Sequence, residues 1–151
     1  DDFSSKPGSP NMFGLIGGRA NSIQPKKRML SSMTPTIVEK NGNLFLILGT
    51  PGGSTIITSV FQTILNAYEY KMDIQKSIDS PRFHHQWVPD SIRFEPNFKN
   101  INELKKLELL GHQFDLQKSG LIGRVDAIMV DENGSISVGA DKRGDDFAET
   151  Y

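Results

Sequence analysis

The sequence contains no cysteine among its 151 residues. Disulfides, thiolate metal sites and thiol nucleophiles are therefore excluded together, while the redox compartment stays open. Long apolar runs are also absent, because the longest falls far short of the roughly 20 residues that span a bilayer. Neither sign of charge predominates, since 17 basic residues stand against 18 acidic ones. This balance provides no general field for nucleic acid or an anionic membrane, so neither is expected as a partner.

The composition is 36% hydrophobic and 23% charged, which suffices for one core of ordinary single-domain size. The chain begins with Asp1 rather than methionine and lacks the basic-then-apolar order of a signal peptide. This start suggests a processed product or a cut piece, from which any upstream signal has gone. Residues 1–33, rich in proline and glycine, are predicted to form a loop region, and residues 34–151 the sheet and helix core of the same single domain.

Alternating and apolar runs predict the secondary structure of that core. Two β-rich runs, 34–40 and 44–48, flank an Asn-Gly turn and predict a hairpin. A second hairpin is predicted over 125–140. An apolar stripe at helical spacing over 56–68 predicts a helix on the sheet, with Ser54 as its N-cap.

Two further helices are predicted from their end signals. One covers 74–79 behind Asp73, and the other covers 101–110 between Asn100 as N-cap and Gly111 as the C-terminal stop.

The first predicted hairpin ends in Thr50-Pro51-Gly52-Gly53, directly before the predicted helix. Free backbone N–H groups at the positive end of a helix, with glycines that allow close approach, favour an anion. Three interpretations stay open. A nucleotide phosphate is disfavoured because no Lys-Ser or Lys-Thr follows the glycines. The oxyanion of an acyl transfer would need such donors, and a tight turn without a ligand needs nothing more.

Other side chains suggest chemistry less directly. Ser31 and Ser32 can donate to a carboxylate or simply serve a turn. Asp1 and Asp2 could hold an ammonium group or be solvated. The pair at residues 84–85 invites a metal or general-base interpretation, but adjacent residues in an extended segment point to opposite faces, which favours a structural role for His84 and His85.

Four segments in this order resemble the small subunit of gamma-glutamyltranspeptidase: DDFS at 1–4, LSSMTPT at 30–36, GTPGGS at 49–54 and PRFHHQW at 81–87. The resemblance implies an α+β fold, part of the αββα sandwich of the N-terminal nucleophile hydrolases. It also implies a threonine nucleophile exposed by self-cleavage upstream of the Asp-Asp motif. This nucleophile is absent from the present chain, which looks like the C-terminal part of the small subunit and is expected to be inactive by itself.

The resemblance assigns roles to individual residues. Asp2 would bind the α-amino group of a glutamyl substrate, Ser31 and Ser32 would hold its α-carboxylate, and Gly52 and Gly53 would form the oxyanion hole. Residues 7–18 resemble a lid loop in which Phe13 stands where lids often carry tyrosine. Phe13 can shield the site from water but cannot donate a hydrogen bond.

The resemblance further implies the activity of a gamma-glutamyl transferase/hydrolase, which cleaves gamma-glutamyl amides such as glutathione and transfers the glutamyl group to water or amino acids. No cofactor and no metal are implied. The partners would be the large subunit and the upstream part of the small subunit of the same precursor, in the periplasm or outside the cell. The alternatives are a phosphate-binding module, a non-catalytic interaction domain and a related acylase on the same scaffold.

Overall fold

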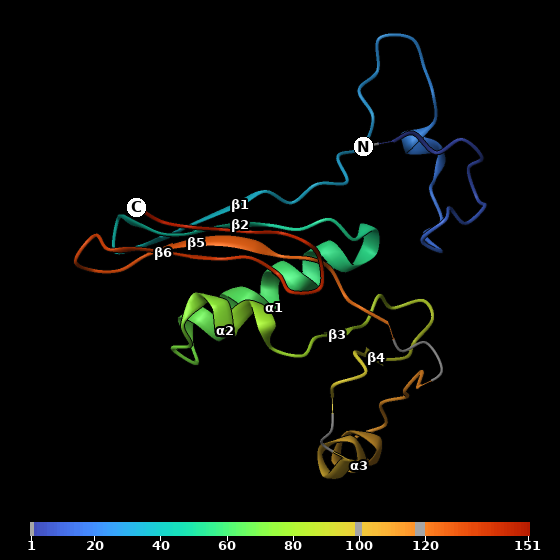
Figure 1. Ribbon diagram of the computed structural model, residues 1–151. Helices are drawn as coiled ribbons and strands as arrows, with labels where there is room; N and C mark the ends of the chain where they lie inside the picture. Colours follow the sequence, from blue (N-terminus) through green and yellow to red (C-terminus); the bar gives the residue numbers. More distant parts are fainter. Residues whose placement is uncertain (1, 99–100, 117–119) are drawn as a thin grey trace. The chain divides into compact units, whose positions relative to one another are not determined.

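The computed structural model describes residues 2–98, 101–116 and 120–151, and it comprises two compact units, Asp1–Thr34 and Pro35–Tyr151. The second unit contains a four-stranded antiparallel sheet in the order β1-β2-β5-β6 (Figure 1). Its strands are β1 (Thr36–Lys40), β2 (Asn43–Gly49), β5 (Asp126–Val130) and β6 (Ile136–Gly139). Both predicted hairpins are therefore confirmed.

The turn between β1 and β2 has the backbone geometry that a two-residue hairpin requires. Asn41 and Gly42 have φ angles of 53° and 79°, which asparagine and glycine adopt more readily than other residues. In the second hairpin, the Asp131 carboxylate accepts hydrogen bonds from the backbone N–H groups of Asn133 and Ser135. Both turns thus follow from side chains that were visible in the sequence.

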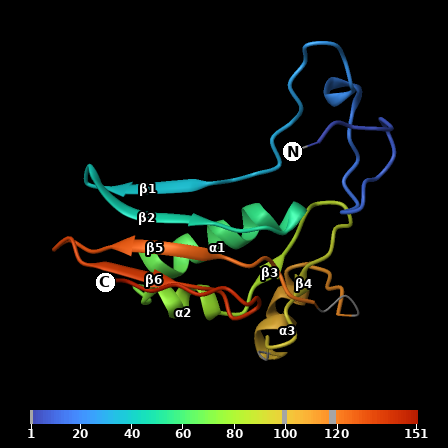
Figure 2. The same ribbon diagram turned by 45° about the horizontal axis from the view of Figure 1, so that its top comes forward.

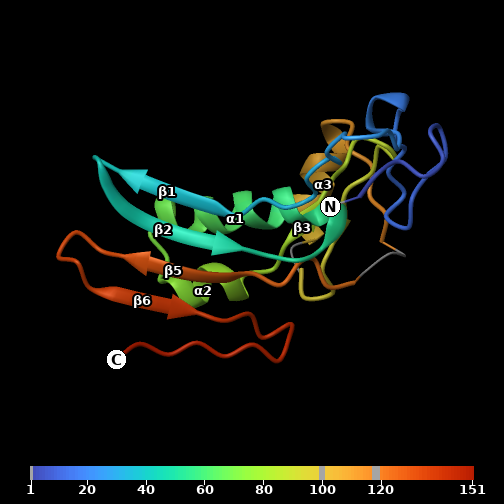
Figure 3. The same cartoon turned by 90° about the horizontal axis from the view of Figure 1, so that it is seen from above.

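Two helices, α1 (Ile56–Tyr68) and α2 (Ile74–Asp79), cover one face of this sheet (Figures 2 and 3). Successive strand side chains point to opposite faces, so Leu46 and Leu48 of β2 enter the core while Ile47 faces away. The buried core cluster consists of Leu46, Leu48, Val60, Ile74, Ile78, Val125 and Ala127.

The sheet face opposite the helices is apolar and uncovered within this unit. Cross-strand pairing aligns Ile37 with Ile47, Ile47 with Ile128, and Ile128 with Val138. The exposed fractions of Ile37, Ile47 and Ile128 are 69%, 36% and 40%. We refer to these four residues as the open β-branched row. An apolar surface of this kind indicates an interaction face.

The predicted helix ends are partly confirmed. The Asp73 carboxylate accepts a hydrogen bond from the Lys76 N–H at 2.8 Å and caps α2. Ser54 as the N-cap of α1 is wrong, because a 3₁₀ turn, η2 (Gly53–Thr55), intervenes and Thr55 directly precedes the helix. Helix α3 (Ile101–Leu109) is followed by Gly111 at a φ of 93°, and its predicted cap, Asn100, lies outside the described residues.

A buried charge network joins parts of the second unit that are distant in sequence. The short strands β3 (Phe83–His84) and β4 (Arg93–Phe94) flank it. Arg82 donates to Asp141 at 2.8 Å, and both side chains are at least 98% buried. Arg143 donates to Asp141 at 3.0 Å and to Glu95 at 2.5 Å. Each carboxylate also accepts backbone N–H groups, so the two buried acids are satisfied, whereas Arg82 Nε has no hydrogen-bond partner among the described residues.

The network also sets the protonation of Asp141. Its burial alone would raise the pKa, but the N–H groups of Arg143 and Val125 and the guanidinium of Arg82 lower it below the ordinary value of 3.8. A carboxylate whose pKa is lowered in the folded state stabilises the fold above its unfolded pKa. That contribution is lost as the pH falls through the folded pKa.

We therefore expect Asp141→Asn to reduce the free energy of unfolding of the full-length protein by about 3–5 kcal/mol at pH 7, because it leaves Arg82 buried without its counter-ion. The variant should also lose less stability than the parent as the pH falls from about 5 to about 3. Urea unfolding across this pH range measures both effects. Glu132→Gln, which breaks the exposed pair with Lys40, is the control and should leave the unfolding curve nearly unchanged.

Candidate functional site

The first unit brings together three of the predicted site residues. Asp2 forms an antiparallel bridge with Leu30, the residue before Ser31 and Ser32. Asn21 holds the two segments on either side: its side-chain amide donates to the Asp2 carbonyl at 3.0 Å, and its side-chain oxygen accepts from the Leu30 N–H at 2.9 Å. All three predicted residues are exposed. The predicted amino-binding and carboxylate-binding groups therefore lie on adjacent segments of one loop region.

Phe13 lies in a tight turn of the same unit. Pro10 and Ile16 form an antiparallel bridge, and between them the Asn11 side-chain oxygen accepts from the N–H groups of Phe13 and Leu15 at 2.9 and 3.0 Å. The Phe13 ring is 45% exposed. The segment predicted as a lid is thus a structured hairpin-like loop with an aromatic side chain at its tip.

Gly52 and Gly53 belong to the second unit and connect β2 to α1. Their φ angles, 141° and 57°, lie in the region that favours glycine. A Cβ atom on Gly52 would also lie 2.5 Å from the Thr55 hydroxyl oxygen. Both the backbone conformation and the space therefore require glycine at position 52.

The carbonyl groups of this turn are held by threonine side chains. The Pro51 carbonyl oxygen accepts from the Thr50 hydroxyl at 2.7 Å. The Gly52 carbonyl oxygen accepts from both the hydroxyl and the N–H of Thr55, at 2.9 and 3.1 Å. A trans peptide directs its N–H opposite to its C=O, so the N–H groups of Gly52 and Gly53 point away from these threonine hydroxyls. Among the residues that the structure describes, none accepts a hydrogen bond from either N–H.

The two histidines have different environments, as their adjacent positions predicted. His84 is buried and its two ring nitrogens pair with the Thr58 hydroxyl at 2.9 Å and the Gln86 side chain at 3.0 Å. Burial lowers the pKa of His84 and so favours the neutral imidazole. His85 is more exposed and pairs with Asp90. Within the described ranges no cluster of side chains suits a metal ion.

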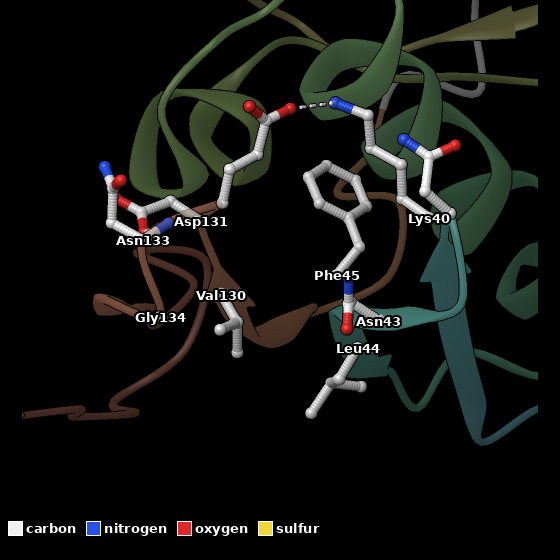
Figure 4. A pocket seen from close by; sticks show the side chains of 10 residues that line it. Lys40, Asn43, Leu44, Phe45, Val130, Asp131, Asn133 and Gly134 are labelled. Atoms are coloured by element: carbon white, nitrogen blue, oxygen red, sulfur yellow. Dashed lines mark hydrogen bonds and ion pairs between the residues drawn. The ribbon is translucent and has the colours of Figure 1, made fainter.

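A groove of about 670 Å³ lies at the other end of β2 (Figure 4). The turns of both hairpins line it, and the Lys40–Glu132 ion pair, 2.8 Å long, crosses it. Asn43 of the groove begins β2, whereas Gly49 ends that strand just before the glycine turn. The groove is therefore separate from the turn that holds Gly52 and Gly53.

Comparison with known proteins identifies the chain's relatives. The sequence profile of gamma-glutamyltranspeptidase matches residues 1–151. The glutathione hydrolase proenzyme of Escherichia coli is 45% identical over 152 residues, which is 100% of this chain and 26% of that protein. The proenzyme of the same name from Bacillus subtilis is 43% identical over 85% of this chain and 22% of its own length. The chain thus spans about a quarter of these relatives.

Solved structures share the same fold. The Helicobacter pylori gamma-glutamyltranspeptidase T380A mutant superposes with a TM-score of 0.85 at 44% identity, covering 94% of this chain and 77% of that chain. The enzyme from Pseudomonas nitroreducens, complexed with L-DON, has a TM-score of 0.85 at 38% identity and covers 100% of this chain and 78% of that chain. The α+β fold expected for an N-terminal nucleophile hydrolase is therefore confirmed. Within that class, the chain belongs to the gamma-glutamyltranspeptidase family.

Sequence reasoning missed Asn21, Thr50 and Thr55. A lone asparagine near a turn and single threonines beside glycines carry no distinctive pattern, and each acts through a hydrogen bond to a backbone group. The only available signal was position: Thr50 and Thr55 flank the glycine pair, and Asn21 lies between the two segments that it joins.

If Asp2 and Ser31 bind a gamma-glutamyl substrate as the sequence predicts, Asn21→Ala in the full-length protein should raise KM by roughly 5- to 30-fold, because it removes two hydrogen bonds worth about 1 kcal/mol each. These bonds hold Asp2 beside the Ser31 segment, so kcat should change much less. Steady-state kinetics measure both constants. The exposed Asn133→Ala in the second hairpin is the control. If Asn21→Ala had the same KM as the parent, the positioning of Asp2 by the Asn21 hydrogen bonds would be wrong.

Proposed function

We propose that the full-length protein containing this chain is a gamma-glutamyl transferase/hydrolase. The observation that carries this proposal is the glycine turn, whose two peptide N–H groups face away from their anchored carbonyls in a member of this family. Such preorganised donors suit the oxyanion of a tetrahedral intermediate. Glutathione and related gamma-glutamyl amides are the proposed donors, and water or amino acids the acceptors, with no cofactor.

The first unit supplies the groups proposed to recognise the glutamyl moiety. The Asp2 carboxylate matches an α-ammonium group in charge, and the hydroxyls of Ser31 and Ser32 can donate to an α-carboxylate. The bridge between Asp2 and Leu30 supports this pairing, because it brings both sets of groups to one place. The loop around Phe13 is proposed to shield the bound substrate from water.

The nucleophile is proposed to be a threonine of the same precursor, upstream of Asp2, so that this chain by itself is inactive. The open β-branched row supports a requirement for the remainder of the precursor. Burial of its three exposed isoleucines would contribute about 1.5–3 kcal/mol for each fully covered side chain. The large subunit and the upstream part of the small subunit are the proposed occupants. A periplasmic or secreted location is also proposed from the family resemblance. Within the described ranges, the helices lack the length and continuous apolar character of a transmembrane span.

Ser31→Ala combined with Ser32→Ala should mainly raise KM in the full-length enzyme. Each lost hydrogen bond to a charged carboxylate is worth about 1.5–3 kcal/mol, and the carboxylate is bound in the ground and transition states alike. Initial rates with a gamma-glutamyl anilide provide the measurement, with the exposed Ser135→Ala as control. An unchanged KM in the double variant would reject the assignment of this pair.

The oxyanion proposal requires removal of a backbone N–H without a change of the turn. Proline at position 53 is unsuitable, because its φ is fixed near −65° whereas Gly53 has a φ of 57°. An amide-to-ester replacement at Gly53, introduced as glycolic acid, deletes the N–H and permits the same φ. We expect kcat to fall by about 10²- to 10³-fold and KM to stay nearly constant, because the oxyanion exists only around the tetrahedral intermediate.

The matched control is an ester at Ser54, which weakens a carbonyl of the same 3₁₀ turn but removes an N–H that is not a proposed donor. The purified chain alone, assayed with the same anilide, gives the background rate and should be inactive. Near-normal kcat in the Gly53 ester, with correct processing and melting, would leave the turn without a role in catalysis.

A further inference from the structure

The orientation of the two proposed donors depends on two peptide planes. The Gly52 N–H belongs to the Pro51–Gly52 peptide, and the Gly53 N–H belongs to the next one. Because each peptide is planar, whatever holds the carbonyl oxygen also fixes the direction of the N–H. The Thr50 hydroxyl holds the first carbonyl at 2.7 Å, and Thr55 holds the second.

The Thr50 hydroxyl is itself fixed by a second hydrogen bond. Its oxygen accepts from the backbone N–H of Arg124 at 2.7 Å. With an acceptor site of the oxygen occupied, the hydroxyl proton is directed to the Pro51 carbonyl. The Thr50 hydroxyl thus joins two segments: it donates to the glycine turn and accepts from segment 122–125.

Gly123 allows this segment to approach closely. Its φ is 66°, and a Cβ atom there would lie 2.4 Å from the Ser59 hydroxyl oxygen and 3.0 Å from that of Thr50. Gly123 also stands behind the turn, because its Cα lies 3.4 Å from the position of a Cβ on Gly52. Residue 123 therefore has no room for a side chain.

The buried charge network holds the segment on both sides of Gly123. The Ile122 carbonyl accepts from Arg82 at 2.8 Å, and the Ile122 N–H donates to Glu95 at 2.8 Å. The Val125 N–H donates to Asp141 at 2.7 Å. The Arg124 N–H that reaches Thr50 thus belongs to a segment whose neighbouring backbone groups are fixed by desolvated charges.

We propose that Thr50 is a positioning residue of the enzyme: its hydroxyl transmits the fixed position of segment 122–125 to the Pro51–Gly52 peptide and so directs the Gly52 N–H toward the oxyanion. Thr55 has the same role for the Gly53 N–H, supported by its own backbone N–H. This inference rests on the proposed function and adds the groups that orient the donors. In this proposal neither threonine touches the reacting atoms.

Thr50→Val tests the proposal in the full-length, processed enzyme, because valine keeps the shape and removes the hydroxyl. We expect kcat for a gamma-glutamyl anilide to fall by at least about 10-fold, less than the loss of a whole donor, with KM nearly unchanged. Thr50→Ser restores the hydroxyl and should return kcat close to the parent value. Thr63→Val, which removes a buried hydroxyl bonded to the Ser59 carbonyl within α1, is the control and should keep the parent kcat.

A second readout separates orientation from general loosening. A boronic acid analogue of the glutamyl substrate, which forms a tetrahedral adduct with a hydroxyl nucleophile, should bind Thr50→Val more weakly by the same factor as the loss of kcat. Glutamate, which forms no adduct, should bind equally well. Equal weakening of both ligands, or failure of Thr50→Ser to restore kcat, would overturn the proposal.

If Thr50→Val fails to fold or to process, Thr55→Val replaces it, since the Thr55 N–H bond to the Gly52 carbonyl remains. It should lower kcat with little change in KM, and a parent-like kcat in a folded Thr55→Val would overturn the proposal. Failure of the positioning proposal can be distinguished from failure of the proposed function. A parent enzyme that does not cleave the anilide rejects the function, whereas an active parent with an equally active Thr50→Val rejects only the positioning role.

Discussion

The buried network of Arg82, Glu95, Asp141 and Arg143 is the interaction on which the second unit depends. Four desolvated charges require extensive hydrogen bonding, and the unit provides most of it by directing backbone groups of residues 78–82 and 122–125 at them, although Arg82 Nε has no partner among the described residues. Removal of any one charge would leave a partner unsatisfied in the interior. The backbone around the network is therefore held in one arrangement, which the apolar core alone would not specify.

Among the described residues, the fixed backbone of segment 122–125 is joined to the glycine turn by the hydrogen bond from the Arg124 N–H to the Thr50 hydroxyl. Segment 122–125 cannot follow a moving turn, because the charges hold it, so the turn must conform to the segment through Thr50. Preorganised donors suit an oxyanion because they need no reorganisation during the reaction. In this chain the proposed preorganisation would be built from non-local charges, two glycines without room for side chains and two hydroxyl groups.

The sequence predicted those features that depend on local physics. Asn41-Gly42 and Asp73 act within their own turns, so their conformations followed from residue type. The prediction of Ser54 as the N-cap of α1 was wrong because a 3₁₀ turn, Gly53–Thr55, precedes the helix. The positions of Gly52 and Gly53 were visible, whereas the charge network was not, because its pairs Arg143–Glu95 and Arg82–Asp141 span 48 and 59 positions and show no periodicity. The two hydrogen bonds of Asn21, to Asp2 and Leu30, span 19 and 9 positions and likewise follow no periodic pattern.

The separation within the network affects how the turn is acquired during folding. Arg82 and Asp141 are 59 positions apart, and closing so long a loop costs entropy before any contact compensates for it. The hairpins and helices have mostly local contacts and can form earlier. The glycine turn, although it spans only a few residues, thus takes its final geometry from contacts that close over long loops. A chain that has not yet closed these loops would lack the groups that fix the orientation of the turn.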